Sequence, residues 1–185
     1  MMTEQMSVKI AALPSLRLTV EAHGLMAKKA LGQNFLLDQN ITDKIINLSL
    51  QKQNKKDFSG ANVFEVGPGP GGLTRAVLAA EPKSLTVVEM DERCIAIMNE
   101  IKEKTGDIIH IINGDAMQTD FSVLAPAPRH IISNLPYNIS VPLLVGWLKN
   151  INAYDSLTLM FQKEVAERIT APIKTKDYGR ISVSY

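Results

Sequence analysis

From residue 61 onward, short apolar runs alternate with longer segments of helical spacing, and this alternation most constrains the fold. We expect strands over residues 61–66, 85–89, 108–112, 130–133 and 157–161. We expect helices over residues 73–80, 92–104, 141–148 and 164–171. Strands separated by helices imply right-handed βαβ units and a parallel sheet. The predicted fold class is therefore α/β, a Rossmann-like core whose five parallel strands extend in both directions from the first, with helices on both faces.

The chain before residue 61 is patterned less clearly. Residues 1–12 are expected to form a mobile end, and residues 13–23 a short helix that Gly24 closes. We therefore expect residues 1–27 to be an N-terminal extension. Residues 28–185 are expected to form one ligand-binding domain.

A second helix is expected after the basic segment 26–36. Asn40 is its predicted N-cap, with Asp43 three residues later. Its predicted apolar face consists of Ile41, Ile45 and Leu48. Residues 51–60 are expected to be a solvated connector.

The composition of the chain excludes several classes of protein. The 185 residues are 45% hydrophobic and 21% charged, with a formal net charge of +1, so bulk charge gives no argument for nucleic-acid binding. A single cysteine, Cys94, can form neither an internal disulfide nor a cysteine-based zinc site. No apolar run approaches the ~20 residues of a membrane span, and the N-terminus lacks a secretory pattern. We expect a soluble cytoplasmic protein.

A glycine-rich loop follows the first predicted strand. Its sequence EVGPGPGG satisfies the pattern G-x-G-x-x-G through Gly67, Gly69 and Gly72. A dinucleotide would need backbone N–H donors around its pyrophosphate, and Pro68 and Pro70 remove two of them. Glu65 would repel a diphosphate and suits ammonium and sulfonium charge, although it could also be a helix-dipole partner. S-adenosylmethionine carries both charges and no phosphate.

Acidic residues also end the second and third predicted strands. Glu89 can accept hydrogen bonds from ribose hydroxyls, and Asp115 can accept one from the exocyclic amine of adenine. Alternatively, Glu89 is a surface cap and Asp115 an N-cap. Because ligands of such sheets bind at the carboxyl ends of the strands, three acids at consecutive strand ends favour a binding site.

The fourth predicted strand leads into Asn134-Leu135-Pro136-Tyr137, beside the switch point of the sheet. Two acceptors, the Asn134 side-chain oxygen and the Leu135 carbonyl, could bind the hydrogens of an adenine amine and free its lone pair. Pro136 would stiffen the turn and Tyr137 would stack on the base. Positioning and electrostatics would then promote in-line methyl transfer without a metal or a covalent intermediate. The alternative is a turn with a packed tyrosine.

These motifs resemble those of the class I adenine-N6 methyltransferases. Residues 28–36, 138–140, 162–168 and 178–180 narrow the resemblance to the ribosomal RNA adenine N6,N6-dimethyltransferases, from about Leu13 to the C-terminus. That family uses S-adenosyl-L-methionine to dimethylate two adjacent adenines near the 3′ end of small-subunit ribosomal RNA. The resemblance implies a cofactor site of Gln33, Asn34, Leu36, Glu65, Gly67, Gly69, Glu89, Met90, Asp115, Ala116 and Asn134. It implies that residues 134–137 hold the target base.

The resemblance also implies the partners. The substrate would be small-subunit ribosomal RNA within an immature 30S-type particle, bound by a monomer without membrane or metal. Family members continue into two more strands and a small helical domain, so we expect this chain to be truncated before them. Candidate phosphate contacts are Lys28, Lys29, Lys163, Arg168, Lys174, Lys176 and Arg180, each of which could equally be a solvated surface charge. Phe161 and Tyr178 could enclose the base, although core packing suits Phe161 as well.

Three alternatives remain. The erythromycin-resistance methyltransferases act on large-subunit RNA, but they usually lack the stretches at 162–164 and 178–180. A noncatalytic ribosome-assembly module could retain the fold. A dinucleotide-dependent oxidoreductase is disfavoured by the two prolines and the acid of the glycine loop. The histidines, His23, His110 and His130, are interpreted as structural, and Cys94 as packed.

Overall fold

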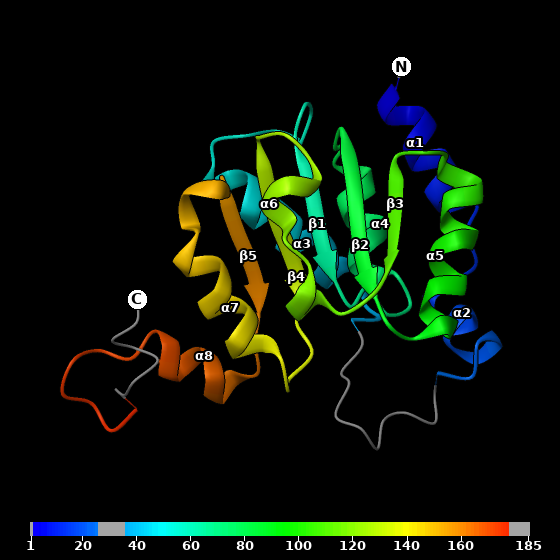
Figure 1. Cartoon of the computed structure of the whole chain (residues 1–185). Helices are drawn as coiled ribbons and strands as arrows, with labels where there is room; N and C mark the ends of the chain where they lie inside the picture. The colour runs from blue at the N-terminus through cyan, green and yellow to red at the C-terminus, as the bar shows by residue number, and fades with distance from the viewer. Residues whose placement is uncertain (1, 26–35, 178–185) are drawn as a thin grey trace.

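The computed structural model describes residues 2–25 and 36–177. Its centre is a five-stranded parallel sheet in the order β3-β2-β1-β4-β5 (Figure 1). The strands are β1 (Asn62–Val66), β2 (Ser84–Glu89), β3 (Ile109–Asn113), β4 (Arg129–Asn134) and β5 (Ser156–Met160). The α/β fold class, the five strands and their extension in both directions from the first are confirmed.

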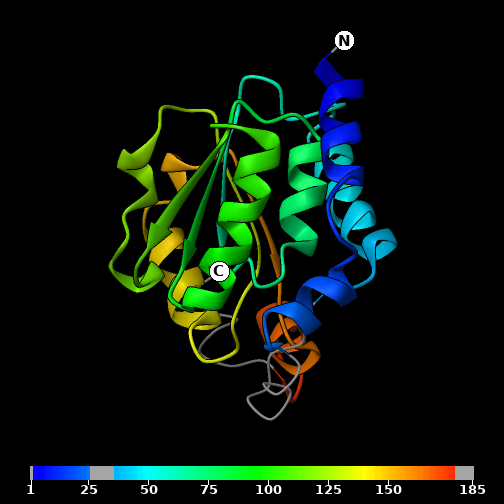
Figure 2. The same cartoon turned by 90° about the vertical axis from the view of Figure 1, so that its right-hand side faces the viewer.

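Helices cover both faces of the sheet. They are α1 (Met2–Ala11), α2 (Leu16–Ala22), α3 (Gln39–Lys52), α4 (Gly72–Ala79), α5 (Glu92–Thr105), α6 (Phe121–Leu124), α7 (Ser140–Lys149) and α8 (Lys163–Ile169). Figure 2 shows the layers, with α1, α3 and α4 on one side of the sheet and α7 on the other. The short helix α6 and two 3-10 turns, Ala116–Gln118 and Ile151–Ala153, were not predicted. None of the helices in the described part of the chain has the length and apolarity to cross a membrane.

The core lies on both sides of β1, and all five residues of that strand are buried. One cluster joins Val63 to Val77 of α4 and Ile97 of α5. The other cluster contains Phe64, Phe121 and Trp147. The ring of Phe121 packs edge to face against both others, with centroids 5.4 Å from Phe64 and 5.9 Å from Trp147. A strand buried on both faces is mostly apolar, as β1 is at Val63, Phe64 and Val66.

The expected mobile N-terminal end is wrong. Residues 2–11 form α1, and its Met6 and Ile10 pack against the first core cluster. Two apolar residues four apart are enough to dock a short helix on one side, although the pattern is too sparse to stand out in the sequence.

Helix α3 begins earlier than expected. Its N-cap is Asp38, whose side chain accepts a hydrogen bond from the Asn40 backbone at 2.9 Å, so the prediction that Asn40 is the cap is wrong. The helix also continues to Lys52, into the expected connector.

The buried face of α3 also differs from the predicted one. Ile41 and Leu48 are each 48% exposed, whereas Ile45 packs against the core as expected. The buried residues are Thr42, Ile46, Ser49 and Leu50. Ser49 contacts Thr158 of β5 with 2.7 Å between the hydroxyl oxygens. Hydroxyl groups that hydrogen-bond to one another can be buried at low cost. The search for apolar residues at helical spacing therefore did not find this partly polar buried face.

Candidate functional site

The glycine loop makes a sharp turn at the carboxyl end of β1. Gly67, Gly69 and Gly71 all have positive φ, at 64°, 55° and 87°, which side chains other than glycine rarely adopt. A Cβ atom at Gly72 would collide with the carbonyl oxygen of Leu36, and one at Gly67 would lie 3.2 Å from Cγ of Pro136. The loop therefore packs closely against two segments that are distant in the sequence.

This packing forms a pocket at the switch point of the sheet. It is lined by Leu36, Glu65, Gly67, Pro68, Pro70, Gly72, Leu73 and Asn134. Four of the predicted cofactor residues are thus brought together, namely Leu36, Glu65, Gly67 and Asn134. Leu73, the second residue of α4, was not anticipated as a lining residue, although its position after the glycine pattern could have indicated it.

The pocket opens because β1 and β4 separate near their carboxyl ends. Their paired residues run only from Asn62↔Arg129 to Phe64↔Ile131, whereas β4 stays paired with β5 as far as Asn134. Beyond the last pair, the hydroxyl of Ser133 donates to the Val66 carbonyl at 2.7 Å and accepts from the Val66 N–H at 3.3 Å. This buried side chain bridges the diverging strands directly before Asn134.

Glu65 is the buried acid of the pocket, with 2% exposure. Oγ1 of Thr74, in the first turn of α4, donates to its Oε2 at 2.7 Å. Burial raises the pKa of Glu65 to about 8; the nearby charge of Glu89 also raises it, and the Thr74 hydrogen bond opposes the shift. A positively charged ligand would stabilise the ionised form of this carboxyl. Sequence reasoning missed Thr74, although a hydroxyl in the first turn after a glycine loop is a usable signal.

Glu89 and Asp115 lie at the carboxyl ends of β2 and β3 but do not line this pocket. Oε1 of Glu89 accepts the N–H groups of Met90 and Asp91 at 2.8 and 2.9 Å. Oδ1 of Asp115 accepts the Met117 N–H at 2.8 Å and caps a 3-10 turn. Asp115 therefore makes the N-cap contact considered as its alternative role, whereas Glu89 accepts N–H groups of the turn after β2 and the N-cap of α5 is Asp91.

Two neighbours of these acids differ in exposure. Met90 is 67% exposed, at the turn after β2. Ala116 is buried in the second core cluster.

The segment after β4 presents its tyrosine to solvent. Leu135 is buried in the second core cluster, whereas Tyr137 is 63% exposed, so it is not the packed tyrosine of the alternative interpretation. The Ile139 N–H donates to the Pro136 carbonyl at 3.2 Å, and the Ser140 hydroxyl donates to the Tyr137 carbonyl at 3.1 Å. These bonds fix the turn before α7.

The other predicted residues are distributed as follows. Gln33, Asn34, Lys28, Lys29, Tyr178 and Arg180 lie outside the described residues. Lys163, Arg168, Lys174 and Lys176 are exposed at or after α8, and Phe161 is half-buried against the second core cluster. Cys94 is buried in the first cluster.

The histidines have separate environments. His110 is exposed, whereas Nε2 of His23 lies 2.9 Å from the Glu100 carboxylate. His130 is fully buried between Lys55 and Ser156.

Comparison with known proteins identifies the family. The family model described as "Ribosomal RNA adenine dimethylase" matches residues 24–185, which include the whole pocket. The chain belongs to this family.

Individual relatives agree with the adenine dimethylase assignment. "Ribosomal RNA small subunit methyltransferase A" of Gluconobacter oxydans is 50% identical over 172 residues, which are 93% of this chain and 55% of the relative. The chain spans only 55 to 64% of the length of the curated relatives that it matches.

Solved structures share the arrangement of the adenine dimethylase fold. A dimethyladenosine transferase from Plasmodium falciparum is 30% identical, with a TM-score of 0.62 over 80% of this chain and 50% of its own. The 23S rRNA methyltransferase ErmE is 26% identical, with a TM-score of 0.58 over 80% of this chain and 53% of its own.

Proposed function

We propose that this chain carries the cofactor-binding part of an enzyme that transfers methyl groups from S-adenosyl-L-methionine to N6 of two adjacent adenosines near the 3′ end of small-subunit ribosomal RNA. The observation that carries the proposal is a single pocket that is lined by both Glu65 and Asn134. Its support from outside the chain is a family of adenine dimethylases and a relative named for the small ribosomal subunit.

The chemistry of the pocket fits the cofactor. When bound, S-adenosylmethionine supplies an electrophilic methyl group on a positively charged sulfur. Glu65 is a buried carboxyl whose ionised form is favoured by such a charge. Pro68 and Pro70 line the same pocket without backbone N–H groups, so they offer nothing to a diphosphate. This difference favours the sulfonium cofactor over a dinucleotide.

Two acids would hold the nucleoside end of the cofactor. Oε1 of Glu89 and Oδ1 of Asp115 are engaged by their own turns, which fixes each carboxylate and leaves its second oxygen to a ligand. We assign the ribose hydroxyls to Glu89 and the adenine amine to Asp115. The remaining proposed cofactor contacts are Gln33, Asn34, Leu36, Gly67, Gly69, Met90 and Ala116.

The target adenine would lie against residues 134–137. The Asn134 side-chain oxygen and the Leu135 carbonyl would accept the amine hydrogens, which favours a pyramidal nitrogen with an available lone pair. The exposed ring of Tyr137 would stack on the base. Because N6 must be unstacked to react, the substrate would be single-stranded or loop RNA.

The proposed partner is an immature 30S-type particle, met by a monomer in the cytoplasm. Lys163, Arg168, Lys174 and Lys176 are exposed and could contact phosphates beside the base site. Large-subunit RNA is the second candidate substrate, because the 23S rRNA methyltransferase ErmE shares this fold. The relative named for the small subunit favours the first.

The decisive experiment measures tritium transfer from labelled S-adenosylmethionine with the full-length protein. Immature 30S particles should be labelled at N6 of adenosine, and 23S RNA should not. Asn134→Ala should abolish the transfer while most of the cofactor affinity remains. Asn150→Ala is the matched control, because Asn150 is an exposed asparagine that precedes β5, at the amino ends of the strands rather than at their carboxyl ends. Unchanged turnover in Asn134→Ala would contradict the role assigned to that residue.

Cofactor choice can be tested with the 185-residue chain. Calorimetry should detect S-adenosylmethionine and S-adenosylhomocysteine but not NAD, and both ligands should raise the unfolding temperature by mass action. Binding of NAD in their place would overturn the proposal.

A further inference from the structure

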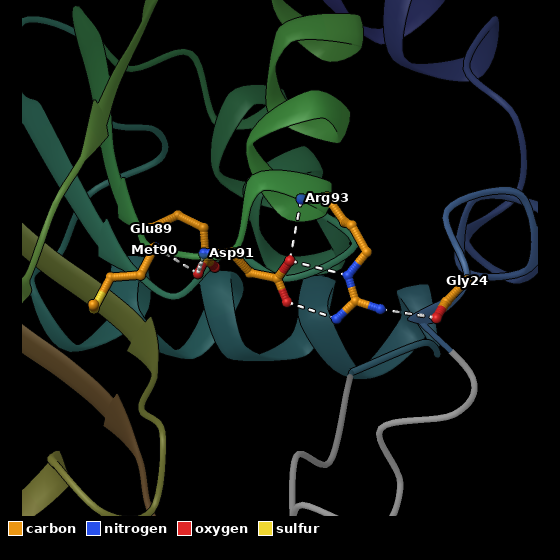
Figure 3. Close-up of polar contacts among 5 residues, drawn as sticks. All are labelled: Gly24, Glu89, Met90, Asp91 and Arg93. Atoms are coloured by element: carbon orange, nitrogen blue, oxygen red, sulfur yellow. Dashed lines mark hydrogen bonds and ion pairs between the residues drawn. The ribbon is translucent and has the colours of Figure 1, made fainter.

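Arg93 joins two segments of the chain that are far apart in sequence (Figure 3). Its Nε and Nη2 atoms donate to Oδ1 and Oδ2 of Asp91 at 3.0 and 2.8 Å. Its Nη1 atom donates to the backbone carbonyl of Gly24, 69 positions earlier, at 3.0 Å. One guanidinium group thus hydrogen-bonds to both the turn after β2 and the segment at the end of α2.

The turn after β2 begins at Glu89, the residue proposed to bind the ribose of the cofactor. Oε1 of Glu89 accepts the backbone N–H groups of Met90 and Asp91 (Figure 3). The orientation of the Glu89 carboxylate therefore depends on the backbone of this turn. Asp91 also caps α5 through the Arg93 N–H, so the same side chain fixes the turn and begins the helix.

The turn is held from its other side by β3. The Gly114 N–H donates to the Glu89 carbonyl at 3.0 Å, and the Asn113 side chain donates to Glu92 at 2.7 Å. The side facing α2 is held by Arg93. A carboxylate that must meet two hydroxyl groups at once benefits from support on both sides, because small displacements weaken both bonds.

The end of α2 is a firm point of attachment. His23 contacts Glu100 of α5 at 2.9 Å, and Leu25 is 1% exposed in the first core cluster. Gly24 lies between these two residues, so its carbonyl is presented to Arg93 by a segment that is already docked on α5.

We infer that Arg93 is a positioning residue, which holds the turn after β2 so that Glu89 meets the ribose of the cofactor. The inference rests on the proposed function and adds a residue to which that function assigns no role. Its geometry requires arginine. A lysine ammonium is a point charge that cannot reproduce the planar fork on Asp91 and reach Gly24 together.

The test measures binding of S-adenosylhomocysteine and of its 2′-deoxy analogue to the 185-residue chain by calorimetry. In the wild type, loss of the ribose hydroxyl should weaken binding about tenfold. Arg93→Ala should weaken binding of the parent compound about tenfold. It should also reduce the difference between the two compounds to less than about threefold, because Glu89 no longer meets the hydroxyl. General destabilisation would weaken both compounds equally.

Two further variants separate the possible causes. Glu100→Gln weakens the contact of His23 with α5 and leaves the Asp91 turn intact, so its affinities should stay within about twofold of the wild type. Arg93→Lys keeps the charge and should show the same reduced discrimination as Arg93→Ala. Circular dichroism establishes that each variant is folded at the temperature of measurement, and if Arg93→Ala is not, Arg93→Lys carries the test.

Each remaining outcome is decisive. Full discrimination in Arg93→Lys, or equal losses in Glu100→Gln and Arg93→Ala, would overturn the inference. Wild-type binding with no change in the Arg93 variants would overturn it while the proposed function stands. A wild-type chain that binds neither compound would overturn the proposed function itself, and the inference with it.

Discussion

The hydroxyl of Thr74 lies 2.7 Å from Oε2 of Glu65, so the first turn of α4 contacts the buried acid at the end of β1. This contact couples the protonation of the pocket to the helix that follows the glycine loop. Burial, the dominant effect, raises the pKa of Glu65 to about 8. The carboxyl of Glu65 is therefore mostly protonated at neutral pH, and a positively charged ligand nearby would favour its ionised form.

Binding of S-adenosylmethionine should depend on pH through Glu65. A positive ligand binds better to the ionised carboxyl, so its affinity should rise with pH up to about 8 and then level off. Binding below that pH should release up to one proton, which calorimetry in buffers of different ionisation enthalpy measures. Glu65→Gln should bind more weakly and show neither effect.

The Thr74 hydroxyl supplies a matched control. Its hydrogen bond lowers the pKa of Glu65, so Thr74→Val should move the midpoint of the affinity profile to higher pH. A profile identical in wild type and Glu65→Gln would assign the pH dependence to another group.

Glu65 should also make the stability of the ligand-free chain decrease with rising pH. Its folded pKa lies above the ordinary value of 4.5, so its contribution is fully present below about pH 4.5 and is lost by about pH 8. The free energy of unfolding of Glu65→Gln relative to wild type should therefore rise by a few kcal/mol across this range. Urea unfolding at both ends measures the change, and a constant difference would contradict the raised pKa.

His130 should make the stability of the chain increase with rising pH, the opposite of the effect of Glu65. Burial, followed by the charge of Lys55, lowers its pKa from 6.5 to about 4. Its contribution is present above about pH 6.5 and is lost as the pH falls towards 4, because the unfolded chain then binds a proton that the folded chain refuses. His130→Gln should show a smaller loss of stability between pH 6.5 and 4 in thermal unfolding. An equal loss would assign the acid sensitivity to other groups.

Gly71→Ala should destabilise the chain more than Gly60→Ala. Both glycines have positive φ, but a Cβ at Gly71 would lie 2.7 Å from Cδ1 of Ile101, whereas nothing lies within 4 Å at Gly60. We expect about 1 kcal/mol for the backbone conformation at Gly60 and a further 1–3 kcal/mol or so for overpacking at Gly71. Denaturant unfolding measures both. Equal losses would show that the first core cluster adapts without strain.

Ser133→Ala should weaken the junction of β1 and β4. The hydroxyl serves both the N–H and the carbonyl of Val66 in a buried position, so its removal should cost about 1–3 kcal/mol. The affinity for S-adenosylhomocysteine should fall as well, because Glu65 and Gly67, on either side of the bridged Val66, line the pocket. Urea unfolding and calorimetry measure the two effects, and a change in neither would show that the strands separate without this bridge.

The sequence by itself determined the sheet, because buried parallel strands are short and mostly apolar, and because helical segments alternate with them along the chain. It also predicted that Glu65, Gly67 and Asn134 line one pocket, since a glycine loop and the end of the strand across the switch point lie side by side in such a sheet, whereas Leu36 was predicted from the family resemblance. It missed α1, the true cap and buried face of α3, and the cross-strand role of Ser133. Those features depend on a few residues whose partners are far away in the chain.

Only the tertiary structure decided how the site residues are supported. Thr74 reaches Glu65 because α4 folds back against β1, and Arg93 reaches Gly24 because α2 docks on α5. Neither contact follows from a periodicity or a fixed spacing along the chain, so no local sequence pattern predicts it. Local propensity and hydrophobic spacing act over a few residues, whereas hydrogen bonds between distant segments exist only after the core has packed.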